Sequence, residues 1–369
     1  MTKTLRTGSP SPFVVAIVAS LLAVVLVSLG LNRADWDPTV FVGFGEEAVA
    51  ITEYATERLG AVELRPVQGH DGKFFFVQAN DPWVTHPAEN AAILDHPIYR
   101  SQRMLYPLIS GGFGLFGPTA VTWGLLVVNI LAMGLGTLAT ARLAQRLGGS
   151  TLWGLAFVAN FGLLYTLTND DAGILAAALA MWAVAMVYEE RLGIAIALLA
   201  GAALTREVMV VCAAGLAVWL WSQHRRKAAL VTLLVPGVAI AGWILYLRYQ
   251  LGPDQADPRA VGWPFVGLAR AVPEWLTDPV VALAGFAVVV ILGLFTVRWA
   301  QTRTALGWMF IGFVPLAALL TDKVWREIFD YTRAVAPLLT AAMLLIFVEA
   351  RAKRERTAIT GRSDAKVSP

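Results

Sequence analysis

The stretch PFVVAIVASLLAVVLVSLGL, residues 12–31, is a predominantly apolar run near the start of the chain. A helix rises about 1.5 Å per residue, so this run is long enough to cross a hydrocarbon core of roughly 30 Å. Lys3 and Arg6 precede it, as in a signal peptide, but no small-x-small cleavage site follows. We therefore interpret residues 12–31 as an uncleaved membrane anchor, which sets the fold class.

The composition of the chain agrees with a membrane protein. Hydrophobic residues make up 57% of the sequence and charged residues 15%, whereas a soluble domain carries about 25% charged residues. Cys212 is the single cysteine, which excludes an intrachain disulfide and a cysteine-based metal cluster.

Further apolar stretches predict an all-α polytopic membrane protein with about ten transmembrane helices. Residues 104–116, MLYPLISGGFGLF, are short and interrupted by Pro107, Gly111 and Gly112, so we expect them to lie at the interface or to re-enter. The nine remaining spans are expected at 119–141, 151–168, 172–188, 192–204, 208–222, 228–247, 279–297, 304–321 and 333–350.

The distribution of Lys and Arg predicts the orientation. Basic residues concentrate in the segments that lie on the same side of the membrane as the N-terminus. Because such segments usually face the cytoplasm, we expect both termini there. We expect one transmembrane domain, residues 1–350, with a polar cytoplasmic tail at 351–369. Residues 32–103 then form a large first outer loop, in which 41–60 have the spacing of an amphipathic helix lying along the membrane surface.

The outer loop contains a candidate general base. In GHDGKFFF, residues 69–76, Asp71 lies between two glycines that permit a sharp turn. A carboxylate held there can accept a proton from a hydroxyl, and the adjacent Lys73 can contact an anion. The alternative is a turn capped by Asp71, with Phe74–Phe76 as a wedge at the interface.

Candidate phosphate ligands follow in LDHPIYRSQRMLYP, residues 94–107. Arg100 and Arg103 share a face if the segment is helical, and guanidinium groups bind phosphate through a planar fork. Tyr106 lies beside them. The alternative is anchoring, with the arginines and Tyr106 at headgroup depth.

Two further charged pairs lie at the ends of predicted spans, one after a span and one before the last span. Arg206 and Glu207 follow a short apolar stretch, so they are expected below the membrane surface, lining a polar cavity or pairing with other helices. Asp330 and Arg333 open the last span, where they can hold a substrate or form a local ion pair.

Asp35 and Asp37 form an Asp-x-Asp pattern after the first span. Two carboxylates at this spacing can share a divalent metal with phosphates. Solvated carboxylates are the alternative, and a divalent metal is the one cofactor that the sequence suggests.

In their order, HDGKFFF (70–76), YRSQRMLYPL (99–108), LTRE (204–207) and DYTRAVAPL (330–338) resemble the GT-C superfamily of integral membrane glycosyltransferases, in particular bacterial multispanning members. His70 stands where such loops often carry Tyr, and Lys73 where they often carry Gln. The resemblance covers roughly residues 12–350.

The resemblance implies transfer of a sugar from a polyprenyl-phosphate carrier to an acceptor at the outer face of the bacterial inner membrane. It implies Asp71 as the catalytic base, with Asp35 and Asp37 as rivals. Membrane lipids are expected partners and nucleic acid is not; the acceptor is unassigned. Two other classes stay open: a transporter or flippase of a lipid-linked substrate, and a non-catalytic membrane assembly protein.

Overall fold

The structure, a computed structural model, describes residues 9–253 and 261–349. Within these ranges, five helical segments have the length and apolarity to cross a membrane. The chain is thus an α-helical protein of the membrane type, and the predicted tail at 351–369 lies outside the described residues. The five are α1 (Pro12–Arg33), α8 (Pro118–Arg146), α14 (Arg226–Leu251), α16 (Pro279–Thr302), and α20 (Ile328–Met343) with its π-helical continuation η4 (Leu344–Glu349).

Shorter helices occupy the other predicted spans. α12 has 14 residues and is therefore about 21 Å long, less than the core of roughly 30 Å. The number of membrane crossings consequently stays a prediction. The helices concerned are α11 (Gly173–Tyr188), α12 (Leu192–Thr205), η3 (Glu207–Met209), α13 (Val210–Ser222), α17 (Ala305–Ile311) and α18 (Phe313–Leu319).

The stretch predicted as one span at 151–168 is broken into η2 (Thr151–Gly154), α9 (Leu155–Val158) and α10 (Phe161–Leu167). Asn160 lies at the last break. Its side chain accepts a hydrogen bond from the Gly162 amide at 3.1 Å and donates to the Ala336 carbonyl at 2.7 Å. Irregular backbone is tolerated among apolar helices when its polar groups are satisfied by protein in this way.

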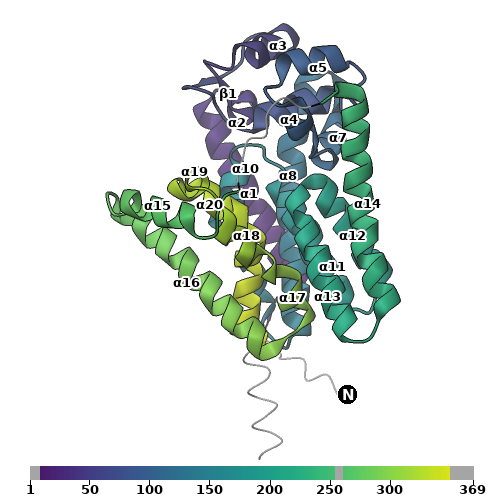
Figure 1. The fold of residues 1–369 in the computed structure, drawn as a ribbon. Helices are drawn as coiled ribbons and strands as arrows, with labels where there is room; N and C mark the ends of the chain where they lie inside the picture. The colour runs from purple at the N-terminus through teal and green to yellow at the C-terminus, as the bar shows by residue number, and fades with distance from the viewer. Residues whose placement is uncertain (1–8, 254–260, 350–369) are drawn as a thin grey trace, which may run out of the picture.

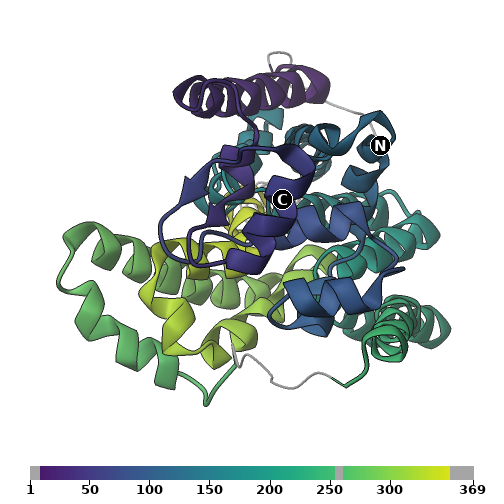
Figure 2. The same ribbon diagram turned by 90° about the horizontal axis from the view of Figure 1, so that it is seen from above.

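The central helix of the bundle is α11, which packs between α8 and α12 (Figure 1). Its alanines are buried on several sides, among them Ala176, Ala180 and Ala183. Small side chains let helix backbones approach closely, which favours such packing in membrane proteins. At the two sides of the bundle lie α14 and the pair α15 (Val266–Trp275) and α16, as Figure 2 shows from above.

The predicted outer loop and the segment that follows it form a folded cap at one end of the bundle (Figure 1). Its two short strands pair in parallel, with Phe44 opposite Leu64. The cap contains α2 (Thr39–Val42), β1 (Phe44–Gly45), α3 (Val49–Leu59), β2 (Leu64–Arg65), α4 (Gly72–Asn80), α5 (Pro87–Ile93), α6 (Pro97–Ser101), α7 (Leu105–Gly111) and η1 (Gly112–Phe116).

One prediction about this cap, the surface helix, and one alternative, the aromatic wedge, are wrong. The helix predicted over 41–60 begins only at Val49, after β1, and its apolar positions Ile51, Tyr54 and Ala55 are buried in the protein. Tyr54 meets Phe76 edge to face, so α3 packs on the cap core. Phe75 and Phe76 are likewise 2% and 0% exposed and form core, not a wedge in lipid.

The two ends of the described chain meet at one end of the bundle. The Thr151 hydroxyl donates to the Pro10 carbonyl at 2.7 Å, and a Cβ at Gly149 would lie 2.5 Å from the Val348 side chain. The start of α1 and the end of η4 therefore lie together, at the end away from the cap (Figure 1).

Candidate functional site

A tight turn places Asp71 between the cap and the bundle. Gly69 has φ +66°, and a Cβ at Gly72 would lie 2.6 Å from the Val42 carbonyl oxygen and 2.7 Å from that of Asn169. Only glycine allows such a conformation and such an approach without strain. The predicted sharp turn at Asp71 is confirmed, and the Asp71 carboxylate makes no capping hydrogen bond to α4.

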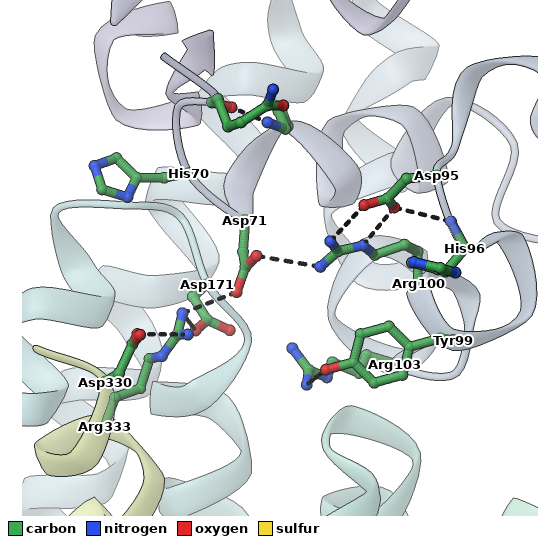
Figure 3. Close-up of polar contacts among 12 residues, drawn as sticks. His70, Asp71, Asp95, His96, Tyr99, Arg100, Arg103, Asp171, Asp330 and Arg333 are labelled. Atoms are coloured by element: carbon green, nitrogen blue, oxygen red, sulfur yellow. Dashed lines mark hydrogen bonds and ion pairs between the residues drawn. The ribbon is translucent and has the colours of Figure 1, made fainter. Parts of the chain in front are cut away.

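The Asp71 carboxylate bridges two guanidinium groups (Figure 3). Its Oδ1 atom lies 3.3 Å from Nη1 of Arg100, and its Oδ2 atom lies 3.0 Å from Nη1 of Arg333. Arg100 comes from α6 in the cap and Arg333 from α20 in the bundle. The predicted acid therefore meets two of the four predicted arginines directly.

Arg333 gathers three carboxylates around one guanidinium. Besides Asp71, Nη1 contacts Asp171 Oδ2 at 2.8 Å and Nη2 contacts Asp330 Oδ1 at 3.2 Å. The Asp171 side chain is 1% exposed. Our sequence analysis did not select Asp171, although the adjacent acids in TNDDAG, residues 168–173, mark a break between two apolar stretches.

Arg100 is held by a second acid. Its Nε and Nη2 atoms each lie 2.8 Å from an oxygen of Asp95, and its guanidinium covers the Phe74 ring at 3.6 Å. Burial acts to raise the pKa of Asp95, but the hydrogen bonds and charge of Arg100, together with the His96 amide, lower that pKa overall. Nη1 is then the nitrogen of Arg100 that makes no contact with Asp95.

The Arg103 and Arg206 side chains are held by other groups of the protein. Arg103 donates to both oxygens of Glu207, at 3.1 and 3.3 Å, and to the Tyr99 hydroxyl at 3.5 Å. Arg206 is 8% exposed and donates to the Arg333 carbonyl at 3.2 Å. Arg206 and Glu207 therefore pair with other parts of the protein, which is the alternative that the sequence left open.

The electrostatics of the site keep Asp71 ionised. Burial acts to raise the pKa of Asp71, but Arg333, Arg100 and Arg103 outweigh it and lower that pKa below the ordinary range. A carboxylate in this state is a weak proton acceptor, because its two oxygens already interact with cations.

A small pocket borders Asp71, and an open apolar groove lies beyond it. Arg103 lines the pocket and the next residue, Met104, lines the groove, so both are bordered by the same stretch of chain. The groove has a volume of about 550 Å³. The pocket is lined by Asp71, Phe74, Phe75, Gln78, Tyr99, Arg100 and Arg103, and the groove by Trp83, Met104, Leu204, Ala239, Gly242, Trp243 and Tyr246.

Two predicted ligands of the substrate lie elsewhere. Lys73 is 4% exposed and donates to the Gln68 carbonyl within the cap. Tyr106 is fully buried, where it donates to the Leu125 carbonyl at 3.0 Å and accepts from Asn129 at 2.9 Å. Both side chains are used by the fold, since neither lines the pocket.

The predicted metal ligands Asp35 and Asp37 are not joined by further acids or histidines. Asp37 accepts a hydrogen bond from the Thr39 amide, at the start of α2, at 2.9 Å, whereas Asp35 is exposed. Across residues 9–253 and 261–349, no group of three or more His, Cys, Asp or Glu side chains is placed to hold a metal ion.

His70 lies on the side of Asp71 away from Arg100 (Figure 3) and contacts an aromatic cluster. His70 Nδ1 lies 3.2 Å from the Tyr165 hydroxyl, and the Tyr165 ring stacks on Phe329 at 4.5 Å. Burial, and then Arg65, lower the pKa of His70 to about 4, so the imidazole is neutral at pH 7.

Comparisons of this chain with protein-family models, with curated proteins and with solved structures find no match.

Proposed function

We propose that this chain is a membrane glycosyltransferase that moves a sugar from a polyprenyl-phosphate carrier to an acceptor hydroxyl, with Asp71 as the general base. The observation that carries the proposal is the meeting of Asp71 with Arg100 and Arg333 beside one pocket. The acid is 262 residues from Arg333 in sequence, so the fold brings together the groups that this chemistry requires.

The reaction needs few groups because the leaving group is a stable anion. The acceptor oxygen attacks the anomeric carbon, the bond from that carbon to the carrier phosphate breaks, and the phosphate leaves with the electron pair. Asp71 takes the proton of the acceptor hydroxyl, and a single displacement inverts the anomeric carbon. Guanidinium groups stabilise the charge that develops on the phosphate oxygens.

The apolar groove supports a lipid-linked donor. Its walls are fixed by hydrogen bonds from Trp243 Nε1 to the Ser101 carbonyl at 2.8 Å and from the Tyr246 hydroxyl to the Trp83 carbonyl at 2.6 Å. A carrier chain lying in it would bring its phosphate to the adjacent Arg103 in the pocket. Arg103 and Arg100 are then the phosphate ligands.

We further propose the orientation given by the basic residues. The cap faces the outside of the bacterial inner membrane, both termini lie in the cytoplasm, and the chain crosses about ten times. The shared position of Pro10 and Val348 at the end away from the cap supports this arrangement.

The test uses purified full-length protein with labelled polyprenyl-phosphate sugars. Asp71→Asn is expected to reduce transfer by about 10²–10⁴-fold, the usual contribution of a general base, while Glu57→Gln, the same charge change at an exposed position of α3, leaves it intact. Movement of the intact donor across vesicles without a new glycosidic bond would favour a flippase. No transfer and no transport with any donor would favour an assembly protein.

A further inference from the structure

The carboxylate of Asp71 occupies a place in the site that suits another anion. At Arg100 its contact is the longer of two, 3.3 Å against 2.8 Å for Asp95. At Arg333 its contact of 3.0 Å lies between those of Asp171 at 2.8 Å and Asp330 at 3.2 Å. Both arginines stay paired if Asp71 moves, so Asp71 is the replaceable member.

Two arginines line the pocket side of this network, and the pocket, at about 10 Å³, has room for one water until the Asp71 carboxylate moves aside. Nη1 of Arg100 has Asp71 Oδ1 as its carboxylate partner, because Asp95 uses Nε and Nη2. Arg103 uses Nε and Nη2 for Glu207 and Tyr99, and its Nη1 atom has no hydrogen-bond partner among the described residues. Arg100 and Arg103 both line the pocket, as does Asp71.

We propose that the pocket is an oxyanion site for a phosphate group, formed by Arg100 and Arg103, in which Asp71 Oδ1 acts as an internal substitute ligand until the phosphate arrives. This inference rests on the proposed function. The phosphate takes over Nη1 of Arg100, and Asp71 keeps only its contact with Arg333. One carboxylate oxygen thereby becomes free to accept a proton from the acceptor.

The exchange resolves a conflict in the proposed mechanism. With both oxygens on guanidinium groups, Asp71 is a weak base, and an incoming phosphate would face a carboxylate across the pocket. Since like charges at short range repel, phosphate and Asp71 Oδ1 compete for Arg100. Donor binding therefore activates the base, and the donor binds before the acceptor is deprotonated.

Competition between Asp71 and phosphate for Arg100 can be distinguished from binding of the donor by Asp71, because the two predict opposite effects of Asp71→Asn on phosphate affinity. If Asp71 helped to hold the donor, neutralising it would weaken the affinity for phosphate. Because Asp71 competes, Asp71→Asn is expected to bind the phosphate about tenfold more tightly, the effect of removing one charged competitor from a guanidinium. Arg100→Gln and Arg103→Gln are each expected to bind it about tenfold more weakly.

The experiment is calorimetric titration of the full-length protein in detergent with farnesyl phosphate and with inorganic phosphate, with farnesol as the uncharged control. Glu57→Gln carries the same charge change at an exposed site and is expected to bind as the unchanged protein does. Thermal unfolding shows that each variant is folded.

If Asp71→Asn binds both phosphates more tightly, the result supports an oxyanion site for free and lipid-linked phosphate alike. If it binds only farnesyl phosphate more tightly, the result supports a site for a lipid-linked phosphate. Equal or weaker binding by Asp71→Asn overturns the exchange. Since no sugar is present, this result is independent of transfer, so the exchange can fail while the glycosyltransferase assignment stands.

Discussion

Asp71 Oδ2 lies 3.0 Å from Nη1 of Arg333, which joins the cap to the last helix of the bundle across 262 residues of sequence. The same guanidinium holds Asp171 and Asp330. One side chain thus contacts acids from three separate segments, and this makes Arg333 a determinant of stability as well as of the site.

Arg333→Gln is expected to destabilise the protein by about 3–5 kcal/mol, because it leaves the buried carboxylate of Asp171 without its cation. The measurement is unfolding in detergent, followed by circular dichroism. The matched control is Arg326→Gln, which removes pairs of the 45%-exposed Arg326 side chain with Glu274 and Asp322 and is expected to cost at most about 1 kcal/mol. Equal losses for the two variants would contradict the prediction.

Gly242→Leu is expected to raise KM for a lipid-linked donor about tenfold and to leave kcat unchanged, because the new side chain fills the groove. A Cβ at Gly242 meets no atom within 4 Å, so the helix itself is not disturbed. Gly237→Leu is the matched control: it lies on the same helix, also meets open space, and does not line the groove. Steady-state kinetics with a polyprenyl-phosphate sugar check both, and an equal rise in KM for Gly237→Leu would count against a lipid groove.

The folded protein is expected to lose stability as the pH falls from about 6.5 to about 4, and His70→Gln is expected to reduce that loss. Burial depresses the pKa of His70 to about 4 in the folded state, against an unfolded value of about 6.5. Between these values the unfolded chain binds the extra proton, so acid favours unfolding. The test compares melting temperatures of the two proteins at pH 7, 5.5 and 4; parallel curves would show that His70 does not contribute.

Lys73→Met is expected to leave KM and kcat for sugar transfer unchanged and to lower stability by about 1–3 kcal/mol. The ammonium donates to the Gln68 carbonyl inside the cap, and its loss leaves that oxygen unpaired. Steady-state kinetics and thermal unfolding of the same preparation test this prediction. A rise in KM with unchanged stability would instead identify Lys73 as a ligand of the substrate.

The sequence was sufficient for the class of the fold and for the helices that are long and apolar. Residues 12–31, 119–141, 228–247 and 279–297 lie in α1, α8, α14 and α16, because apolar length alone decides such elements. It was not sufficient for 151–168, where Asn160 ends one helix and starts another through bonds to Ala336 and Thr340. That break depends on a partner segment far along the chain.

The site shows the same division. Asp71, Arg100 and Arg333 could be chosen by residue type, since a charge beside apolar stretches needs a partner. Which charges meet could not be predicted, because that depends on how the helices pack. Lys73 and Tyr106 were predicted as ligands from their neighbours in sequence, yet their side chains donate hydrogen bonds to the carbonyls of Gln68 and Leu125. Asp171 was not predicted, because adjacent acids between two apolar stretches are also what an ordinary break between spans looks like.

The contact between Asp71 and Arg333 also bears on how the protein is made. At about 5–20 residues per second, the ribosome adds Arg333 roughly 13–50 s after Asp71. During that interval neither Asp71 nor the buried Asp171 has Arg333 as its cation. The Asp71–Arg333 contact can therefore form only once α20 has been made, and a product that ends before α20 lacks this link between the cap and the bundle.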